Sequence, residues 1–248
     1  MTPLTQSLTE GTLASVVDLA RTQTATLTVA DLAEHAGYSP FHFSRIFSSH
    51  VGIGPGQYLT ALRIDEAKRL LLTGDEPIID VATAVGFESL SSFSRRFHAT
   101  VGVAPGQLRR LAEHLSSRPP RPFTLLRPHP SSLRVHLELP PGSDARGDPS
   151  VWVGWYPYPA PIGLPRSGVL VSGVPHLDLP LCDGAPFLLG FAVPAQADPL
   201  DMLVPESPLV AVHPAPLRDG GEVTLRFSAQ AASGRPPLLS ALPSLCRS

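Results

Sequence analysis

Two arginines, Arg45 and Arg95, stand 50 residues apart in this chain of 248 residues, and each follows a phenylalanine by two positions. A guanidinium group carries five N–H donors in a planar fork and keeps its positive charge in proteins. It can form two parallel hydrogen bonds with a phosphate or with the O6 and N7 atoms of a guanine. A matched pair of arginines therefore predicts a surface that binds an anion or the edge of a base.

The two arginines belong to an internal repeat. Residues 32–56 read LAEHAGYSPFHFSRIFSSHVGIGPG, and residues 81–106 read VATAVGFESLSSFSRRFHATVGVAPG. Gly37 and Gly86 are 49 residues apart rather than 50, because the second copy has one extra residue in its turn. Each copy reads as a helix, a glycine-centred turn and a second helix, which predicts two helix-turn-helix units.

Capping signals mark where these helices begin. Thr28 precedes Asp31 by three residues, which predicts a capping box at the first helix of copy one. Ser39 and Ser89 precede the second helix of each copy and can accept a hydrogen bond from its free N–H groups. A long helix is predicted over residues 56–72, and such a rod would fix the distance and rotation between the two units.

Packing alone is the simpler explanation of a single such unit, since small helical bundles with a glycine turn are common. Within each copy the phenylalanines at positions 43 and 47, and 93 and 97, are four residues apart and should point into a core. Packing does not require a matched arginine on the opposite face of both copies. The repeat therefore favours two readers of DNA over a structural bundle.

Residues 8–113 resemble the DNA-binding domain of AraC/XylS-type transcription regulators, through the segments AGYSPFHFSRIF, VGIGPGQY, VGFESLSSFSRRF and VGVAPGQL. The resemblance implies seven helices, with the third and sixth as recognition helices. It places base reading on Phe41, Ser44, Arg45, Leu90, Ser91, Ser92 and Arg95. The arginines that we expect to contact backbone phosphates are Arg63, Arg96, Arg109 and Arg110.

Three positions depart from the pattern of that family. Gly54 and Ala104 stand where Ser or Thr usually caps the helix after each reader, which predicts weaker caps. Leu108 replaces an aromatic residue, which predicts looser packing of the last helix. The family's DNA-binding part also lies more often at the C-terminus.

The net charge of −2 and the isoelectric point near 6.5 exclude a uniformly basic surface. Binding to DNA depends on local neutralisation of phosphates rather than on total charge. Lys68 is the single lysine of the chain, so every other fixed cationic side chain is an arginine.

Proline divides the chain, because five of its 29 prolines fall in residues 1–118 and 24 in residues 119–248. We predict an α + β protein of two domains: a helical DNA-binding domain over 1–117, a proline-rich linker over 118–123 and an all-β sandwich or barrel over 124–248. The predicted strands lie in the segments 133–139, 151–158, 168–173, 186–193, 208–213 and 222–227.

The β-rich part could sense a small effector or serve as an assembly module, and this alternative rests on analogy with regulators of two domains. Its segment WVGWYPY places Trp152, Tyr156 and Tyr158 on one face of a strand and Trp155 on the other. These four residues are the candidate ligand site, because aromatic faces with polar tips bind sugars and flat apolar molecules. Core packing is the competing explanation.

Catalytic and metal sites are not expected. His176 and Asp178 form an H-x-D pair without a positioned nucleophile, and Asp198 and Asp201 lie in a proline-rich stretch. Neither the histidines nor the two cysteines have the spacing of a zinc site. We therefore expect no enzyme and no cofactor.

The expected partner is double-stranded DNA. A small-molecule effector and a contact with RNA polymerase are left open, and the oligomeric state is unknown. No run of 18 apolar residues and no leader-like start are present, so we expect a cytoplasmic protein without a membrane partner.

Overall fold

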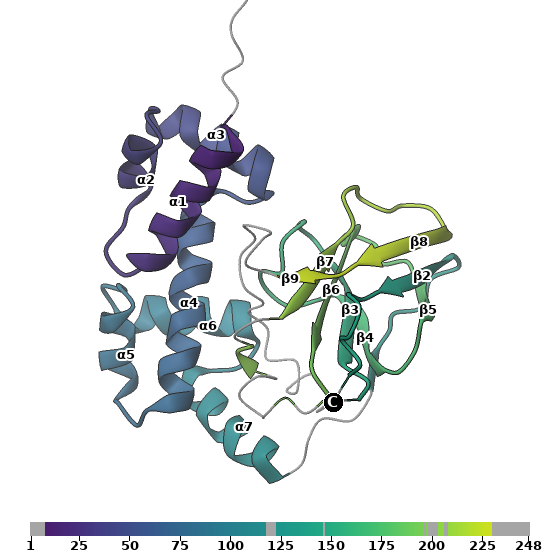
Figure 1. Ribbon diagram of the computed structural model, residues 1–248. Helices are drawn as coiled ribbons and strands as arrows, with labels where there is room; N and C mark the ends of the chain where they lie inside the picture. The colour runs from purple at the N-terminus through teal and green to yellow at the C-terminus, as the bar shows by residue number, and fades with distance from the viewer. Residues whose placement is uncertain are drawn as a thin grey trace, which may run out of the picture.

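The computed structural model describes residues 8–117, 123–145, 147–195, 197, 203–205 and 208–229, with the side chains of residues 112–117 left out. Residues 8–117 are called the helical half here, and residues 123–229 the β-rich half. The helical half comprises α1 (Glu10–Thr22), α2 (Val29–His35), α3 (Pro40–Val51), α4 (Pro55–Thr73), α5 (Ile78–Ala84), α6 (Leu90–Val101) and α7 (Pro105–Ser117) (Figure 1). Helices α1 to α3 are called the first reading unit, after their predicted role, and α5 to α7 the second, while α4 joins them.

The predicted capping signals are confirmed. Thr28 donates its backbone N–H to Asp31 Oδ2 (2.8 Å), and the Asp31 N–H donates to Thr28 Oγ1 (3.3 Å). These hydrogen bonds from the Thr28 backbone and hydroxyl hold the pKa of Asp31 below its usual value. The hydroxyls of Ser39 and Ser89 each accept from the N–H three residues later, at 3.4 and 3.3 Å. The recognition helices α3 and α6 therefore begin at equivalent positions.

Each reading unit has its own hydrophobic core. In the first unit Phe43 and Phe47 are fully buried, and their ring centroids lie 5.4 Å apart. In the second unit Phe93 and Phe97 repeat this arrangement at 5.5 Å. Helix α4 contributes to both cores, because Leu59 and Leu62 pack in the first, and Ile64 and Leu71 in the second. The long helix thus joins two separate clusters.

The turns between helices require glycine. Gly37 and Gly86 have φ angles of 75° and 84°, a conformation that side chains with a Cβ disfavour. Gly86 has a second constraint, since a Cβ there would overlap the backbone carbonyl of Ala25 in the α1–α2 loop. Nothing lies within 4 Å of the equivalent point on Gly37. The first unit therefore contacts the second at Ala25 and Gly86.

The β-rich half forms two sheets. The first has the strand order β1-β4-β3-β6-β7-β9, and the second the order β5-β2-β8, in which β2 and β8 are parallel. The strands are β1 (Phe123–Leu125), β2 (Ser132–Glu138), β3 (Ser150–Tyr156), β4 (Ser167–Ser172), β5 (His176–Pro180), β6 (Phe187–Val193), β7 (Leu209–Val212), β8 (Gly221–Arg226) and β9 (Ser228–Ala229). The described strands form two separate sheets and close no barrel. The sequence analysis allowed a sandwich or a barrel, and the barrel alternative is wrong.

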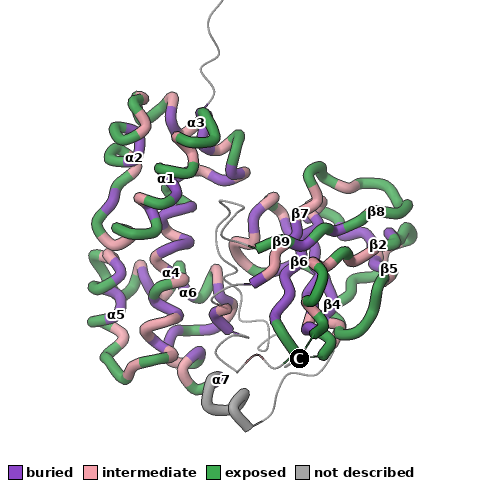
Figure 2. The backbone as a smooth tube through the Cα atoms, in the orientation of Figure 1, coloured by how far each residue is buried: buried purple, intermediate pink, exposed green. Residues whose placement is uncertain are grey.

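A core of apolar side chains lies between the two sheets. Val135 and Leu225 from the small sheet pack with Val153, Trp155 and other residues of the large sheet. Strand β6 is buried almost along its length, whereas β8 is mostly exposed (Figure 2). Trp152 lies in a second cluster, on the other face of β3 from Trp155, as the alternation predicts.

The linker and strand β5 differ from the sequence analysis. Residues 118–122 of the predicted linker lie outside the described residues, and Phe123, its last residue, begins β1. Strand β5 was not predicted, although its residues alternate between exposed His176 and Asp178 and the inward Leu177 and Leu179.

The two halves lie side by side (Figure 1) and share contacts between side chains. Ala160 of the β3–β4 hairpin is fully buried in the core of the first reading unit. Leu203 and Val204 are buried in the core of the second unit. Ile162 packs against both cores. The β-rich half is thus attached to both units of the helical half.

Candidate nucleic-acid interface

Helix α3 presents the expected residues of the first unit at its surface. Phe41 is 84% exposed, and Arg45, one turn further along the helix, is also exposed. Ser44 is half-buried, and its hydroxyl donates to the Pro40 carbonyl (2.7 Å). A large apolar ring exposed to this extent on a helix is available for contact with another molecule.

Helix α6 presents the second set. Leu90 is 39% exposed, and Ser91 and Arg95 are exposed as well. Ser92 is half-buried beneath this face, where its backbone N–H is bonded to the cap Ser89. The structure therefore brings the predicted residues of each copy onto one helix, and the β-rich half leaves Arg45 and Arg95 uncovered.

The guanidinium groups of Arg45 and Arg95 make no hydrogen bond or ion pair with any described residue. Their N–H donors are therefore available to an acceptor outside the protein. Each arginine lies on a helix whose opposite side is fixed by two buried phenylalanines. A rigid support of this kind reduces the conformational entropy lost on binding.

Arg63 has internal partners. Its Nε donates to the Thr24 carbonyl (3.0 Å), and its Nη2 donates to the Leu27 carbonyl (2.9 Å). Burial lowers the pKa of its guanidinium below the usual arginine value. These bonds hold the α1–α2 loop, whose Ala25 carbonyl lies against Gly86. The observed geometry gives Arg63 a positioning role between the two units, and its predicted phosphate contact stays a prediction.

Arg109 holds the corresponding loop of the second unit. Its Nε donates to the Leu71 carbonyl (3.1 Å) and its Nη2 to the Glu76 carbonyl (2.9 Å). Arg96 and Arg110 are exposed. Within the described part of the chain, the Arg96 side chain makes no hydrogen bond or ion pair. Of the four arginines predicted to contact phosphate, Arg96 and Arg110 are exposed, and the contacts themselves stay predictions.

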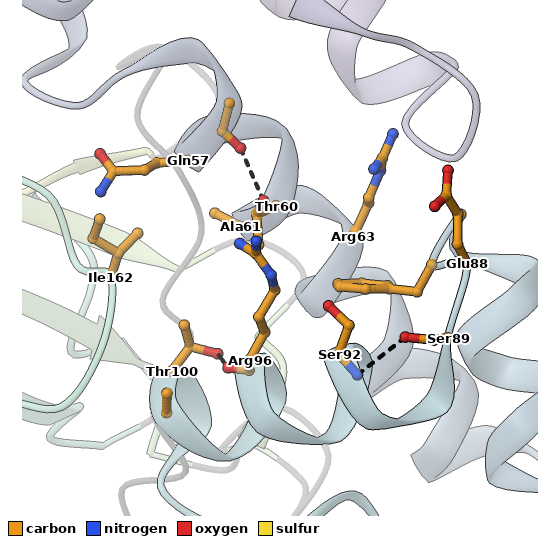
Figure 3. Close-up of a pocket in the computed structure, with 14 residues that line it drawn as sticks. Gln57, Thr60, Ala61, Arg63, Glu88, Ser89, Ser92, Arg96, Thr100 and Ile162 are labelled. Atoms are coloured by element: carbon orange, nitrogen blue, oxygen red, sulfur yellow. Dashed lines mark hydrogen bonds between the residues drawn. The ribbon is translucent and has the colours of Figure 1, made fainter.

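Arg96 extends into an open cavity of about 740 Å³ between α4 and the second unit (Figure 3). Its side chain runs from α6 toward Thr60 and Ala61 of α4 (Figure 3). Ser92 also lines this cavity, so the cavity borders the reading face of α6. Ile162 reaches it from the β-rich half. Groups from α4, from the second unit and from the β-rich half therefore meet in one space.

The departures from the family pattern have local consequences. Gly54 caps α4 without a side chain, and its N–H donates instead to Gln57 Oε1 (3.3 Å). That bond supplies one half of a capping box, so the cap is incomplete. Leu108 is fully buried, which shows that the last helix keeps its packing position with a leucine.

The aromatic residues of the β-rich half do not form one exposed surface. Trp152, Trp155 and Tyr156 are 0–1% exposed, and Trp155 Nε1 donates to the Pro180 carbonyl (2.8 Å). Tyr158 is 49% exposed. A ligand approaching from solvent would reach Tyr158 and not the other three.

The other candidates for chemistry are surface pairs. Asp178 forms an ion pair with Arg134 (3.0 Å), which holds the pKa of Asp178 below its usual value. The His176 ring lies 5.9 Å from that of His136. Asp198 and Asp201 lie outside the described residues. Among the described residues, no group of three or more His, Cys, Asp or Glu side chains could hold a metal ion.

Comparison with known proteins decides what the helical half is. A family model described as a helix-turn-helix domain matches residues 32–111. The transcriptional activator AarP of Providencia stuartii is 39% identical over 83 residues, which is 34% of this chain and 62% of AarP. The helical half is an AraC-type helix-turn-helix domain.

Other relatives match the same domain. The melibiose operon regulatory protein of Escherichia coli is 37% identical over 87 residues, 35% of this chain and 29% of that protein. The activator NphR of Rhodococcus sp is 35% identical over 122 residues, 43% of this chain and 36% of NphR. The solved DNA-binding domain of AdpA, in complex with a target DNA, is 34% identical, with 44% of this chain and 97% of that one covered and a TM-score of 0.39.

The chain thus spans at most about two thirds of the length of these curated relatives. The AraC-type domain accounts for the helical half alone. As for membrane association, none of the helices in the described ranges has the length and apolar character that crossing a bilayer requires.

One segment that contacts the helical half is not identified by the sequence analysis. The hairpin residues Pro159, Ile162 and Leu164 contact the AraC-type domain, but we had included only Tyr158 of this region as a candidate. The signal was the run PAPIGLP, which places apolar side chains among prolines in a loop. Apolar residues in an irregular segment need a partner surface, and here the surface is the other half of the chain.

Proposed function

We propose that this protein is a DNA-binding transcriptional regulator that reads two adjacent major-groove segments. The observation that carries the proposal is the pair of uncovered faces on α3 and α6, each with an arginine that has no partner among the described residues. Successive major grooves on one side of B-DNA lie about 34 Å apart, and two units joined by one long helix can occupy both.

The proposed roles follow from the chemistry of each side chain. Arg45 and Arg95 would each bond a guanine through O6 and N7. Phe41 and Leu90 would contact thymine methyl groups, while Ser44, Ser91 and Ser92 would bond base edges or nearby phosphates. Arg96 and Arg110 would contact the phosphate backbone, which positions the protein without reading sequence.

Regulation of transcription is supported by the names of the relatives. AarP and NphR are described as transcriptional activators, and the E. coli relative as the regulatory protein of the melibiose operon. Activation and repression are both compatible with two readers on one duplex. The proposed division into domains is 1–117 for DNA binding and 124–248 for modulation.

For the β-rich half, the finer proposal is that a small ligand modulates DNA binding. The cavity of about 740 Å³ has the size of a small-molecule site, and a ligand there would contact α4, α6 and Ile162 together. The alternative is a module for protein interaction or dimerisation that needs no ligand. Sedimentation of the full-length protein distinguishes the two, because a stable dimer that persists without any added ligand favours assembly.

The experiment that tests DNA binding is selection from a pool of randomised duplexes with the full-length protein at near-physiological salt. The expected outcome is enrichment of a defined sequence over successive rounds. A double variant with Arg45→Ala and Arg95→Ala is the control, and it should enrich nothing. Equal recovery of random sequences by the wild type and the control would overturn the proposal.

A further inference from the structure

The β-rich half contacts the AraC-type domain at two positions that are equivalent in the repeat. Gly52 ends α3 and Gly102 ends α6, both in the left-handed conformation with φ of 84° and 90°. Pro159 packs on Gly52, with its Cγ 2.6 Å from the place of an added Cβ, and Leu164 packs on Gly102 at the same distance. The segment 159–164, called the bridge, therefore runs from the end of one recognition helix to the end of the other.

The middle of the bridge is packed as well. Ala160 is fully buried in the core of the first unit. The Ile162 N–H donates to the Ala160 carbonyl (2.8 Å), which closes a tight turn, and the Ile162 side chain packs against the cores of both units. The prolines at 159 and 161 fix two φ angles of this short segment. These contacts and the two proline rings restrict the conformation of the bridge.

The base of the bridge is anchored in the β-rich half. It is the connection between β3 and β4, which pair in an antiparallel hairpin. The Arg166 N–H donates to the Trp155 carbonyl (2.9 Å), and the Trp155 side chain is buried between the two sheets. A movement of the bridge would require a movement of this hairpin.

Two other links join the reading units, namely α4 and the contact of Ala25 with Gly86. Helix α4 reaches the C-terminal ends of both recognition helices from the core, since Val51 of α3 and Val101 of α6 lie in the two clusters that α4 joins. The bridge contacts the same ends from the side of the β-rich half. It therefore adds a constraint on the rotation of α3 relative to α6.

We propose that Pro159, Ile162 and Leu164 of the bridge determine the spacing between the two DNA segments that the protein selects. The proposal rests on the proposed function in DNA binding. One added base pair turns the second groove by about 35° and moves it by about 3.4 Å, so a fixed pair of recognition helices accepts one spacing. If the bridge let the two units rotate, the protein would bind DNA with several spacings.

The first test needs no DNA. Spin labels are placed on the equivalent exposed positions Glu34 and Thr83 as cysteines, with Cys182 and Cys246 replaced by alanine. Pulsed electron resonance should give one narrow distance in this parent. The triple variant Pro159→Ala, Ile162→Ala and Leu164→Ala should broaden the distribution about twofold.

The matched control is Leu126→Ala, a leucine of the β-rich half that is 42% exposed, compared with 38% for Leu164. Leu126 is not among the residues that pack on the AraC-type domain, so its variant should keep the narrow distance. If the triple variant does not fold, Ile162→Ala alone should broaden the distribution to a lesser degree. An unchanged width in a folded bridge variant would overturn the proposal.

The second test uses duplexes in which the two selected motifs are separated by different numbers of base pairs. The wild type should prefer one spacing, and the triple variant should lose about tenfold of that preference against a spacing one base pair longer. An identical preference in both proteins would overturn the proposal. If the wild type binds no duplex of the series, the proposed function fails, while the label distances still decide whether the bridge fixes the two units.

Discussion

The turn glycine Gly86 lies so close to the Ala25 carbonyl that a methyl group on Gly86 would overlap that oxygen. The contact joins the second reading unit to the first. Arg63 holds the same loop by donating hydrogen bonds to the carbonyls of Thr24 and Leu27. The separation of the two units therefore depends in part on contacts that Ala25, Arg63 and Gly86 make within the protein.

Replacing the turn glycines Gly37 and Gly86 by alanine should lower the free energy of unfolding by different amounts. Gly37→Ala should lower the free energy of unfolding by about 1–2 kcal/mol, because only the left-handed backbone is strained. Gly86→Ala should lower it by about 3 kcal/mol or more, because overlap with a backbone atom adds to the same strain. Denaturant titration followed by circular dichroism measures both. Equal losses would show that the Ala25 contact contributes nothing.

Substitutions of Arg63 and Arg96 should affect different properties, the first the stability of the protein and the second its affinity for DNA. Arg63→Gln should lower the free energy of unfolding by about 2–3 kcal/mol, since two hydrogen bonds from a charged group are lost. Arg96→Gln should leave stability unchanged and reduce the salt dependence of DNA binding by about one unit of slope. Melting curves and binding isotherms at several salt concentrations test the pair. A stable Arg63→Gln protein with a reduced salt slope would instead favour the predicted phosphate contact of Arg63.

Lys68 should give a pH dependence of stability at alkaline pH. It is fully buried in α4, and burial lowers its pKa to about 8, with a partial opposing effect from Asp65. Between pH 8 and the ordinary value of 10.5 the unfolded chain holds a proton that the folded chain has lost. The free energy of unfolding should therefore rise by about 2–3 kcal/mol across this window, and Lys68→Met should remove that rise.

The same lysine offers a direct measurement. It is the single lysine of the chain, so isotope labelling of lysine gives one side-chain signal in a nuclear magnetic resonance titration. A midpoint near pH 8 agrees with burial of the ammonium group. A midpoint near 10.5 would mean that the group is solvated in the folded protein.

Trp155 and Tyr158 should distinguish packing from ligand binding in the β-rich half. Trp155→Phe should lower the free energy of unfolding by about 1–3 kcal/mol, because the bond to the Pro180 carbonyl is lost and space is left in the core. Tyr158→Ala should change it by less than about 0.5 kcal/mol, since the ring is half exposed. Thermal denaturation of the two variants checks this order, and a larger loss at Tyr158 would contradict it.

Much of the helical half was predictable because its signals are local. A Thr–Asp pair three residues apart, serines before recognition helices and glycines in turns each act within one turn of helix. The long helix was predicted over 56–72 and is Pro55–Thr73. The interval of 50 residues placed Arg45 and Arg95 at equivalent positions, and the structure leaves both exposed.

The rest depends on contacts between distant parts of the chain. Nothing near Arg63 in the sequence indicates that its guanidinium meets carbonyls 36 and 39 residues away. Strand β5 is defined by its pairing with β2. In that pairing Asp178 lies opposite Arg134 and forms an ion pair with it. The bridge could likewise not be predicted, because its role depends on contacts between the β3–β4 connection and the distant helices.

The central claim is that α3 and α6 each read their own segment of one duplex. The most direct test is guanine methylation interference on the enriched duplex, with the wild type, Arg45→Ala and Arg95→Ala. The wild type should show two patches of interference about one helical turn apart on the same side of the DNA. Arg45→Ala should lose one patch and Arg95→Ala the other, each with a cost of about 1–3 kcal/mol in binding free energy. A single patch in the wild type, or loss of the same patch in both variants, would contradict the account.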